Sequence, residues 1–199
     1  MLQFASGIKL PFPEKLKEEF QVFPQFISFH ISLEKILPMV DAFLDQMEEP
    51  LFFVLQLPLN EEEEIEARKK ENSQMLHQKV CYLDGQSKAQ VRSLLQQYGE
   101  LFLQDGLSQF AVGSHVTPDE IFIQKYKLVN IYSSELTKYF DFLHKYGLTQ
   151  TDNLVTAWDT FSRETPGEAR LIKIDGMDVF DVYEKLVELG MYDAKIIEC

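Results

Sequence analysis

The stretch that indicates the fold class most directly is residues 26–57, FISFHISLEKILPMVDAFLDQMEEPLFFVLQL. Its two ends are runs of apolar, aromatic and β-branched residues, which is typical of strands. Between them, apolar side chains recur every three or four positions over residues 33–47, which predicts an amphipathic helix. Pro38 lies inside that helix and should kink it or delay its start. The order strand, helix, strand predicts that the two strands pair in parallel through a right-handed connection.

The same alternation of patterns continues along the rest of the chain. Apolar side chains with helical spacing predict helices over 88–104, 134–146 and 178–189, and a short one over 153–161. Strand-like runs occupy 79–83, 108–112, 121–132, 170–174 and 193–198.

The order of these segments predicts how the strands pair. The stretch 170–198 repeats the order strand, helix, strand and predicts a second parallel pair. The runs 108–112 and 121–132 are close enough along the chain to form an antiparallel pair. Within 121–132 the alternation is lost near Lys125, which predicts a bulge or a break into two strands. We therefore expect an α+β fold, shading to α/β, with four to five helices packed on a mixed β-sheet.

Length and composition predict one domain. The chain has 199 residues, 45% of them hydrophobic, which suffices for a core that needs no disulfide or metal. We expect a single globular domain over 1–199, either undivided or with two lobes. The charged segment 60–75 is the segment expected to be mobile. Glu64 precedes Arg68 by four positions, as in an exposed helix, but a polar connection without an apolar face fits the segment equally well.

The chain predicts a cytoplasmic location. Its two cysteines, Cys81 and Cys199, are too few for a secreted disulfide scaffold and are expected to be free thiols. The first residues lack the basic and long apolar regions of a secretory signal. No run of 18 apolar residues occurs, so we expect no membrane span.

The charge distribution predicts a basic protein partner. The net charge is −13, and residues 30–66 hold −9 of it. Such a field repels phosphate backbones, which argues against nucleic-acid binding, and it attracts basic proteins. On the helix predicted at 33–47, three acidic residues share one face opposite the apolar face. The residues expected to bind the partner are Asp41, Asp45, Glu48, Glu49, Glu61 and Glu62.

The connection 105–120 contains the candidate catalytic residues. Ser114, His115, Asp119 and Glu120 supply a hydroxyl, an imidazole and two carboxyls, the groups that a hydrolase uses as nucleophile, base and acids. Their spacing does not match the Gly-x-Ser-x-Gly nucleophile elbow. A structural interpretation also fits, in which Thr117 and Glu120 form a capping box and Pro118 begins a helix.

Motifs for cofactors and metals do not occur. The chain has no Gly-x-Gly-x-x-Gly and no Walker loop, so we expect no nucleotide cofactor. It has no Cys-x-x-Cys, and no two of its four histidines are four residues apart, so we expect no metal site.

Three functions remain open from the sequence. The first is a non-enzymatic acidic protein-binding domain, of the kind that immunity proteins represent when they neutralise basic toxins through complementary charge. The second is a small hydrolase that uses the 105–120 connection with His115 as general base. The third is a structural or regulatory subunit whose partner contacts apolar surface.

Overall fold

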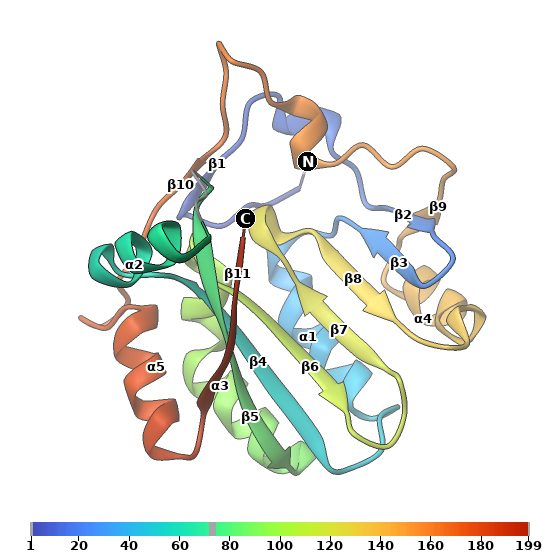
Figure 1. The fold of residues 1–199 in the computed structure, drawn as a ribbon. Helices are drawn as coiled ribbons and strands as arrows, with labels where there is room; N and C mark the ends of the chain where they lie inside the picture. Colours follow the sequence, from blue (N-terminus) through green and yellow to red (C-terminus); the bar gives the residue numbers. More distant parts are fainter. Residues whose placement is uncertain (1, 72–74, 199) are drawn as a thin grey trace.

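The computed structural model describes residues 2–71 and 75–198, and a nine-stranded sheet organises it (Figure 1). The strand order is β11-β5-β4-β6-β7-β8-β3-β2-β9. Neighbouring strands are antiparallel, except that β2 and β9 are parallel, so the sheet is mixed. Its strands are β2 (Glu19–Val22), β3 (Phe26–Phe29), β4 (Leu51–Pro58), β5 (His77–Gln86), β6 (Gln109–Ser114), β7 (Glu120–Ile123), β8 (Val129–Tyr132), β9 (Thr149–Gln150) and β11 (Tyr192–Glu198).

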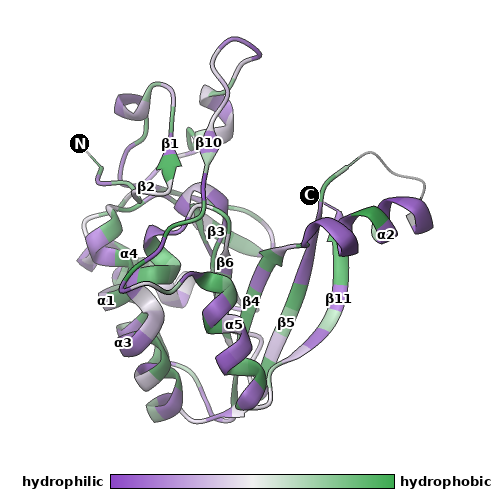
Figure 2. Cartoon of the chain, turned by 90° about the vertical axis from the view of Figure 1, so that its left-hand side faces the viewer, coloured by the Kyte–Doolittle hydropathy of each residue, from purple (hydrophilic) through white to green (hydrophobic). Residues whose placement is uncertain are grey.

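Five α-helices accompany this sheet in the described residues, which confirms the predicted α+β class. They are α1 (Leu33–Leu44), α2 (Glu61–Glu71), α3 (Lys88–Gln104), α4 (Phe140–Lys145) and α5 (Val179–Glu188). Short 3-10 turns lie at η1 (Pro13–Lys15), η2 (Lys125–Lys127), η3 (Leu136–Tyr139) and η4 (Ala157–Thr160), and β1 (Ile8–Lys9) pairs with β10 (Glu168–Ala169) in a second, two-stranded sheet. Helices α1, α3 and α5 lie together on one face of the large sheet (Figure 2).

Helix α3 shows how the sequence builds the core between the helices and the sheet. Ser87 and Gln90 form a capping box at its N-terminus. The ring of Phe102 lies 5.7 Å from that of Phe53 on β4 and 5.6 Å from that of Phe110 on β6, whereas Leu95 lines a groove with Leu37 of α1. The apolar side chains whose spacing predicted this helix are buried, among them Leu94, Leu95, Tyr98, Leu101 and Phe102.

The two predicted parallel pairs are wrong. Strands β3 and β4 run in the same direction, but β6, β7 and β8 lie between them, so α1 connects strands that are not neighbours. Strand β11 pairs with β5 in antiparallel register. The pattern at 26–57 placed β3, α1 and β4 correctly, whereas the neighbours of these strands in the sheet lie far away in the sequence.

The predicted strand at 170–174 does not form. Its backbone groups are bound elsewhere: Arg170 N–H donates to the carbonyl of Gly7, and the Arg170 carbonyl accepts from Gly106 N–H. The Ile172 N–H donates to the buried carboxylate of Asp105 at 3.1 Å. The segment therefore joins the N-terminal segment to the end of α3 rather than adding a strand to the sheet.

The predicted break within 121–132 is confirmed, with two antiparallel strands, β7 and β8, on either side of η2. Tyr126 and Lys127 adopt positive φ angles of 57° at this turn. The ammonium of Lys127 is buried and donates to the carbonyls of Phe102 and Asp105 at 2.8 and 2.7 Å. Lys127 thus satisfies carbonyl groups at the C-terminal end of α3, where no intrahelical donor is present.

The charged segment 60–75 contains helix α2. Glu64 and Arg68 form the expected pair, with 2.6 Å between Oε1 and Nε, which supports the helical alternative. Residues 72–74 lie outside the described residues, and the mobility of the segment stays a prediction. Cys81 is a buried free thiol, whereas Cys199 lies outside the described part of the chain. In the described residues, no helix combines the length and apolar character that spanning a membrane requires.

Candidate functional site

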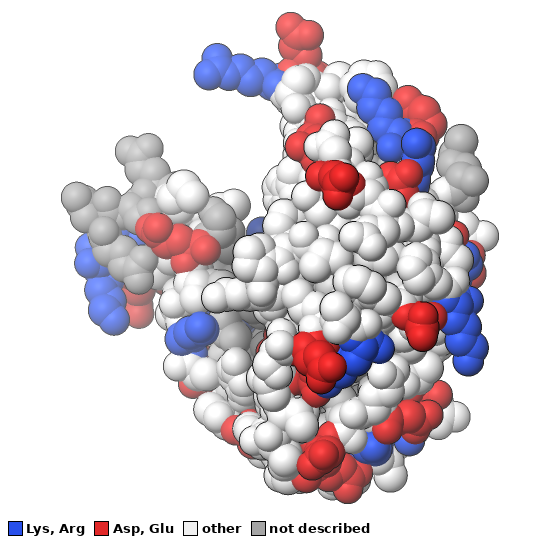
Figure 3. Space-filling model, turned by 90° about the vertical axis from the view of Figure 1, so that its right-hand side faces the viewer, with Lys and Arg blue, Asp and Glu red and all other residues white. Residues whose placement is uncertain are grey.

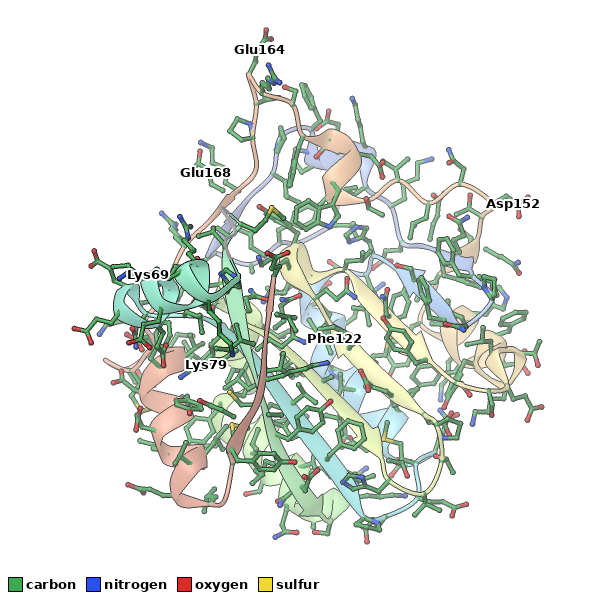
Figure 4. All side chains as sticks on the ribbon, in the orientation of Figure 1. Lys69, Lys79, Phe122, Asp152, Glu164 and Glu168 are labelled. Carbon is green, nitrogen blue, oxygen red and sulfur yellow. The ribbon has the colours of Figure 1, made fainter. Side chains whose placement is uncertain are left out.

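The face of the sheet opposite α1, α3 and α5 is here called the open face (Figures 1 and 2), and it carries a cluster of apolar and aromatic side chains. Alternate residues of each strand point to it. Val54, Val80 and Ala111 are buried there because the larger side chains of Phe52, Tyr82, Phe122 and Ile197 surround them. Figure 4 shows Phe122 near the middle of the sheet, on the side that faces the viewer. The open face is thus a partly exposed apolar surface rather than a solvated polar one.

Aromatic rings form a row across one end of the open face. The ring of Phe52 lies 5.7 Å from that of Tyr82 and 5.1 Å from the imidazole of His115. The ring of Tyr82 lies 6.4 Å from that of Tyr192 on the edge strand β11. Rings at these distances stabilise one another and hold a defined surface.

Asp84 joins two of these side chains. Its Oδ1 atom lies 2.9 Å from His115 Nε2, and its Oδ2 atom accepts a hydrogen bond of 2.6 Å from the hydroxyl of Tyr192. The hydrogen bond to Asp84 raises the pKa of the Tyr192 phenol, because loss of its proton would place two negative charges together. This arrangement orients His115 against the ring of Phe52.

A cavity of about 320 Å³ opens at the hairpin between β6 and β7, and we call it the hairpin pocket. The sheet register explains its walls: Phe52 is opposite Gly113, Gly113 is opposite Glu120, and Glu120 is opposite Tyr132. The Phe52 ring leans over Gly113, since a Cβ atom at Gly113 would lie only 2.2 Å from Phe52 Cζ. The residues that line the pocket are Phe52, Ser114, Thr117, Pro118, Asp119, Glu120 and Tyr132.

Two carboxylates in this pocket differ in their partners. Asp119 is 2% exposed in its side chain, and it accepts hydrogen bonds from Lys138 Nζ at 2.9 Å and from Ser133 Oγ at 2.7 Å. Burial alone would raise the pKa of Asp119, but these hydrogen bonds outweigh it and lower the pKa below its ordinary value. Glu120 is partly buried, and its carboxylate forms no hydrogen bond or ion pair with the described residues. Burial raises the pKa of Glu120.

Ser114 has a structural role in the hairpin. Its hydroxyl donates to the carbonyl of Glu48 at 2.6 Å and accepts from the N–H groups of Val116 and Thr117. His115 bonds instead to Asp84, so the structure does not bring Ser114 and His115 together as nucleophile and base. The predicted capping box of Thr117 and Glu120 is wrong, because no helix follows: residues 115–118 form the hairpin loop and Glu120 begins β7.

The acidic residues predicted to bind a partner do not form one continuous surface. On α1, Asp41 and Asp45 both accept from the guanidinium of Arg92 on α3, each at 2.6 Å. Glu48 and Glu49 follow α1 and are exposed, and Glu49 accepts a hydrogen bond from the backbone N–H of Lys88. Glu61 and Glu62 are exposed on α2, beyond the other end of the eight-residue strand β4, which spans about 25 Å. In Figure 3, acidic and basic side chains occur in small mixed groups separated by uncharged surface.

Sequence reasoning found part of this site and missed the rest. It identified Ser114, His115, Asp119 and Glu120, which the hairpin between β6 and β7 holds near one another. It missed the aromatic residues of the open face and Asp84. The signal was present in β4, where Phe52 and Val54 make the outward positions as apolar as the inward ones. Such a strand is typical of a sheet covered on both faces, yet here α1, α3 and α5 cover only one.

The described residues, 2–71 and 75–198, contain no group of three or more His, Cys, Asp or Glu side chains arranged to hold a metal ion. Comparison of the chain with protein-family models, with curated proteins and with solved structures finds no match.

Proposed function

We propose that this chain is an acidic protein-binding domain that docks a basic protein partner on its open face. The observation that carries the proposal is the pairing of an uncovered, partly exposed aromatic face with two carboxylates, Asp84 and Glu120, that no lysine or arginine of the described residues neutralises. A few residues supply most of the binding free energy in protein interfaces, and tyrosine, tryptophan and arginine are enriched among them. Carboxylates without basic neighbours favour a partner of positive charge.

The net charge of −13 supports the same proposal at longer range. A strongly acidic protein attracts a basic one before contact, which raises the association rate. The acidic residues on α1 and α2 contribute to this attraction wherever they lie, and the open face supplies the short-range contacts. A domain of this kind would act by covering a functional surface of its partner, as an immunity protein covers a basic toxin.

Site-specific photo-crosslinking tests the proposal. A benzoylphenylalanine at position 122 places the photoreactive group on the open face and preserves the aromatic character of the native Phe122. The control carries the same group at Leu189, which is 69% exposed beyond the end of α5. In native cells we expect position 122, and not position 189, to form an adduct with one basic protein.

The captured protein must then bind the unmodified chain after purification. We expect a stoichiometric complex whose association rate falls as salt is added, because salt screens the attraction. An adduct with an acidic protein, or equal labelling at positions 122 and 189, would contradict the proposal.

A further inference from the structure

The hairpin pocket places one carboxylate between two rings. Glu120 stands between Gly113 and Tyr132 in the sheet register, and the ring of Phe52 fills the space above Gly113. Tyr132 is held from its other side, because its ring lies 5.5 Å from that of Phe26 and its hydroxyl accepts from Asn130 Nδ2 at 3.2 Å. Glu120 therefore lines the same pocket as Phe52 and Tyr132, at a position between them in the strand order.

Glu120 is the acidic group of this pocket whose charge is not balanced. The neighbouring Asp119 already has Lys138 as its counter-ion, at 2.8 Å. The carboxylate of Glu120 has lost part of its hydration without gaining a hydrogen bond or ion pair from the described residues. A partly dehydrated carboxylate is costly unless a cation binds to it. The pocket therefore favours an external cation.

The two rings indicate which cation fits. An arginine guanidinium is planar, stacks on aromatic faces and binds a carboxylate through two parallel hydrogen bonds. It is also more weakly hydrated than a lysine ammonium, so it gives up less water on entering a partly buried site. Positive charge over an aromatic ring adds further attraction.

We propose that the hairpin pocket binds the guanidinium of one arginine side chain of the basic partner, with Glu120 as its counter-ion and the rings of Phe52 and Tyr132 on either side. This inference rests on the proposed function, since it names the group of the partner that enters the open face. The partner's arginine is the central contact of the interface. The surrounding contacts exclude water from it, which strengthens its ion pair with Glu120.

Three short peptides test the chemistry on the intact chain: acetyl-Gly-Arg-Gly-amide, the same peptide with lysine, and the same peptide with neutral citrulline. Binding is followed by chemical-shift changes in the ¹⁵N-labelled protein. We expect the arginine peptide to shift the amide signals of Gly113, Glu120 and Tyr132, the lysine peptide to bind more weakly, and the citrulline peptide not to bind. Equal binding of the arginine and citrulline peptides, or shifts confined to other parts of the chain, would overturn the proposal.

Two variants with the same change in charge locate the site. Glu120→Gln removes the pocket's charge and keeps its shape, and we expect arginine-peptide binding to weaken about tenfold or more. Glu164→Gln removes one exposed charge from the loop at the top of Figure 4 and should leave binding unchanged. Tyr132→Leu is a second variant of the pocket itself. It removes one ring and no charge, and we expect it to weaken arginine-peptide binding as well. Thermal unfolding of each variant verifies that it folds.

The outcomes separate this proposal from the proposed function. If position 122 captures a basic partner whose affinity is the same for Glu120→Gln and Glu164→Gln, the arginine pocket is wrong and the proposed function stands. If the arginine peptide binds at Glu120 but position 122 captures no basic partner, the pocket stands and the proposed function is wrong. If lysine and arginine peptides bind equally well, the assignment of a guanidinium is wrong.

Discussion

The hydroxyl of Ser114 donates a hydrogen bond of 2.6 Å to the backbone carbonyl of Glu48. This contact joins the hairpin between β6 and β7 to the segment that connects α1 with β4. The same oxygen accepts from two backbone N–H groups of the hairpin loop, so all its hydrogen-bonding capacity is used within the protein. Ser114 therefore stabilises the loop that forms one wall of the hairpin pocket.

We expect Ser114→Ala to lower the free energy of unfolding by about 1 kcal/mol, because it removes three hydrogen bonds to partly buried backbone groups. Urea unfolding measures the change. Ser162→Ala, which removes an exposed hydroxyl from the loop after η4, is the control and should have a smaller effect. If Ser114→Ala instead retained full stability and lost biological function, the hydrolase hypothesis would regain support.

Leu95 tests the helical core. The residue is 8% exposed and belongs to the main core, where it lines a groove with Leu37 of α1, and we expect Leu95→Ala to cost about 2–5 kcal/mol through lost contacts and a residual cavity. Leu189→Ala, at a position that is 69% exposed, should change stability little. Equal melting temperatures for the two variants would show that α3 does not pack as described.

His30 should make stability fall in mild acid. Its imidazole is 1% exposed, and burial lowers its pKa to about 4, although the charge of Asp159 acts in the opposite direction. Because the folded state binds the proton less tightly than the unfolded chain, with its ordinary pKa of 6.5, the stability due to His30 is complete above about pH 6.5 and decreases until about pH 4.

The size of the His30 effect follows from the same two pKa values. We expect the free energy of unfolding to fall by about 2 kcal/mol between about pH 7 and about pH 5. The variant His30→Phe removes the titrating group and should lose most of this dependence. Identical pH profiles for the native chain and the variant would assign the dependence to other groups.

Gly113→Ala tests the geometry of the hairpin pocket. The added methyl group would lie 2.2 Å from Phe52 Cζ, so the ring must move away from Gly113. We expect weaker binding of the arginine peptide, with only a modest loss of stability, because the displaced ring is partly exposed. Unchanged binding would show that Phe52 is not a wall of the site.

The acidic residues on α1 and directly after it should raise the rate of association with the basic partner. The triple variant Asp41→Asn, Asp45→Asn, Glu48→Gln should slow association with the basic partner at low salt and leave dissociation unchanged. Arg92→Gln removes the base that pairs with Asp41 and Asp45, so it should accelerate association. If both variants associate at the native rate across a salt series, these residues play no part in attracting the partner. Glu120→Gln should differ from the triple variant and from Arg92→Gln, because we expect it to accelerate dissociation of the complex with the basic partner.

The elements that the sequence predicted well are those with local signals. The apolar spacing over 88–104 was sufficient to place α3 and its buried face. The loss of alternation near Lys125 indicated a bulge or a break, and the chain divides there into β7 and β8. In each case the deciding contacts lie within a few residues or turns of the chain.

The neighbours of each strand and the existence of the open face could not be predicted, because both depend on segments that are distant in the sequence. Nothing near Phe29 indicates that it pairs with Val129, 100 positions later. Residues 170–174 have strand-like composition, but the buried carboxylate of Asp105 and the backbone of Gly7 bind their backbone groups. Glu120 was found through its loop composition, whereas its relation to Phe52 and Tyr132 depends on the register of three strand pairs.

The strand order has a consequence for how the chain folds during synthesis. Strand β3 leaves the ribosome early, but its neighbour β8 follows about 100 residues later, and β2 pairs with β9 later still. One edge of β5 stays unpaired until β11 has been made, since Tyr82 pairs with Tyr192, 110 positions later. Pairings so distant in sequence are slow to form, typically in milliseconds to seconds. Until these later strands have been made, the aromatic strands of the nascent chain therefore present unpaired edges, where association with other chains begins.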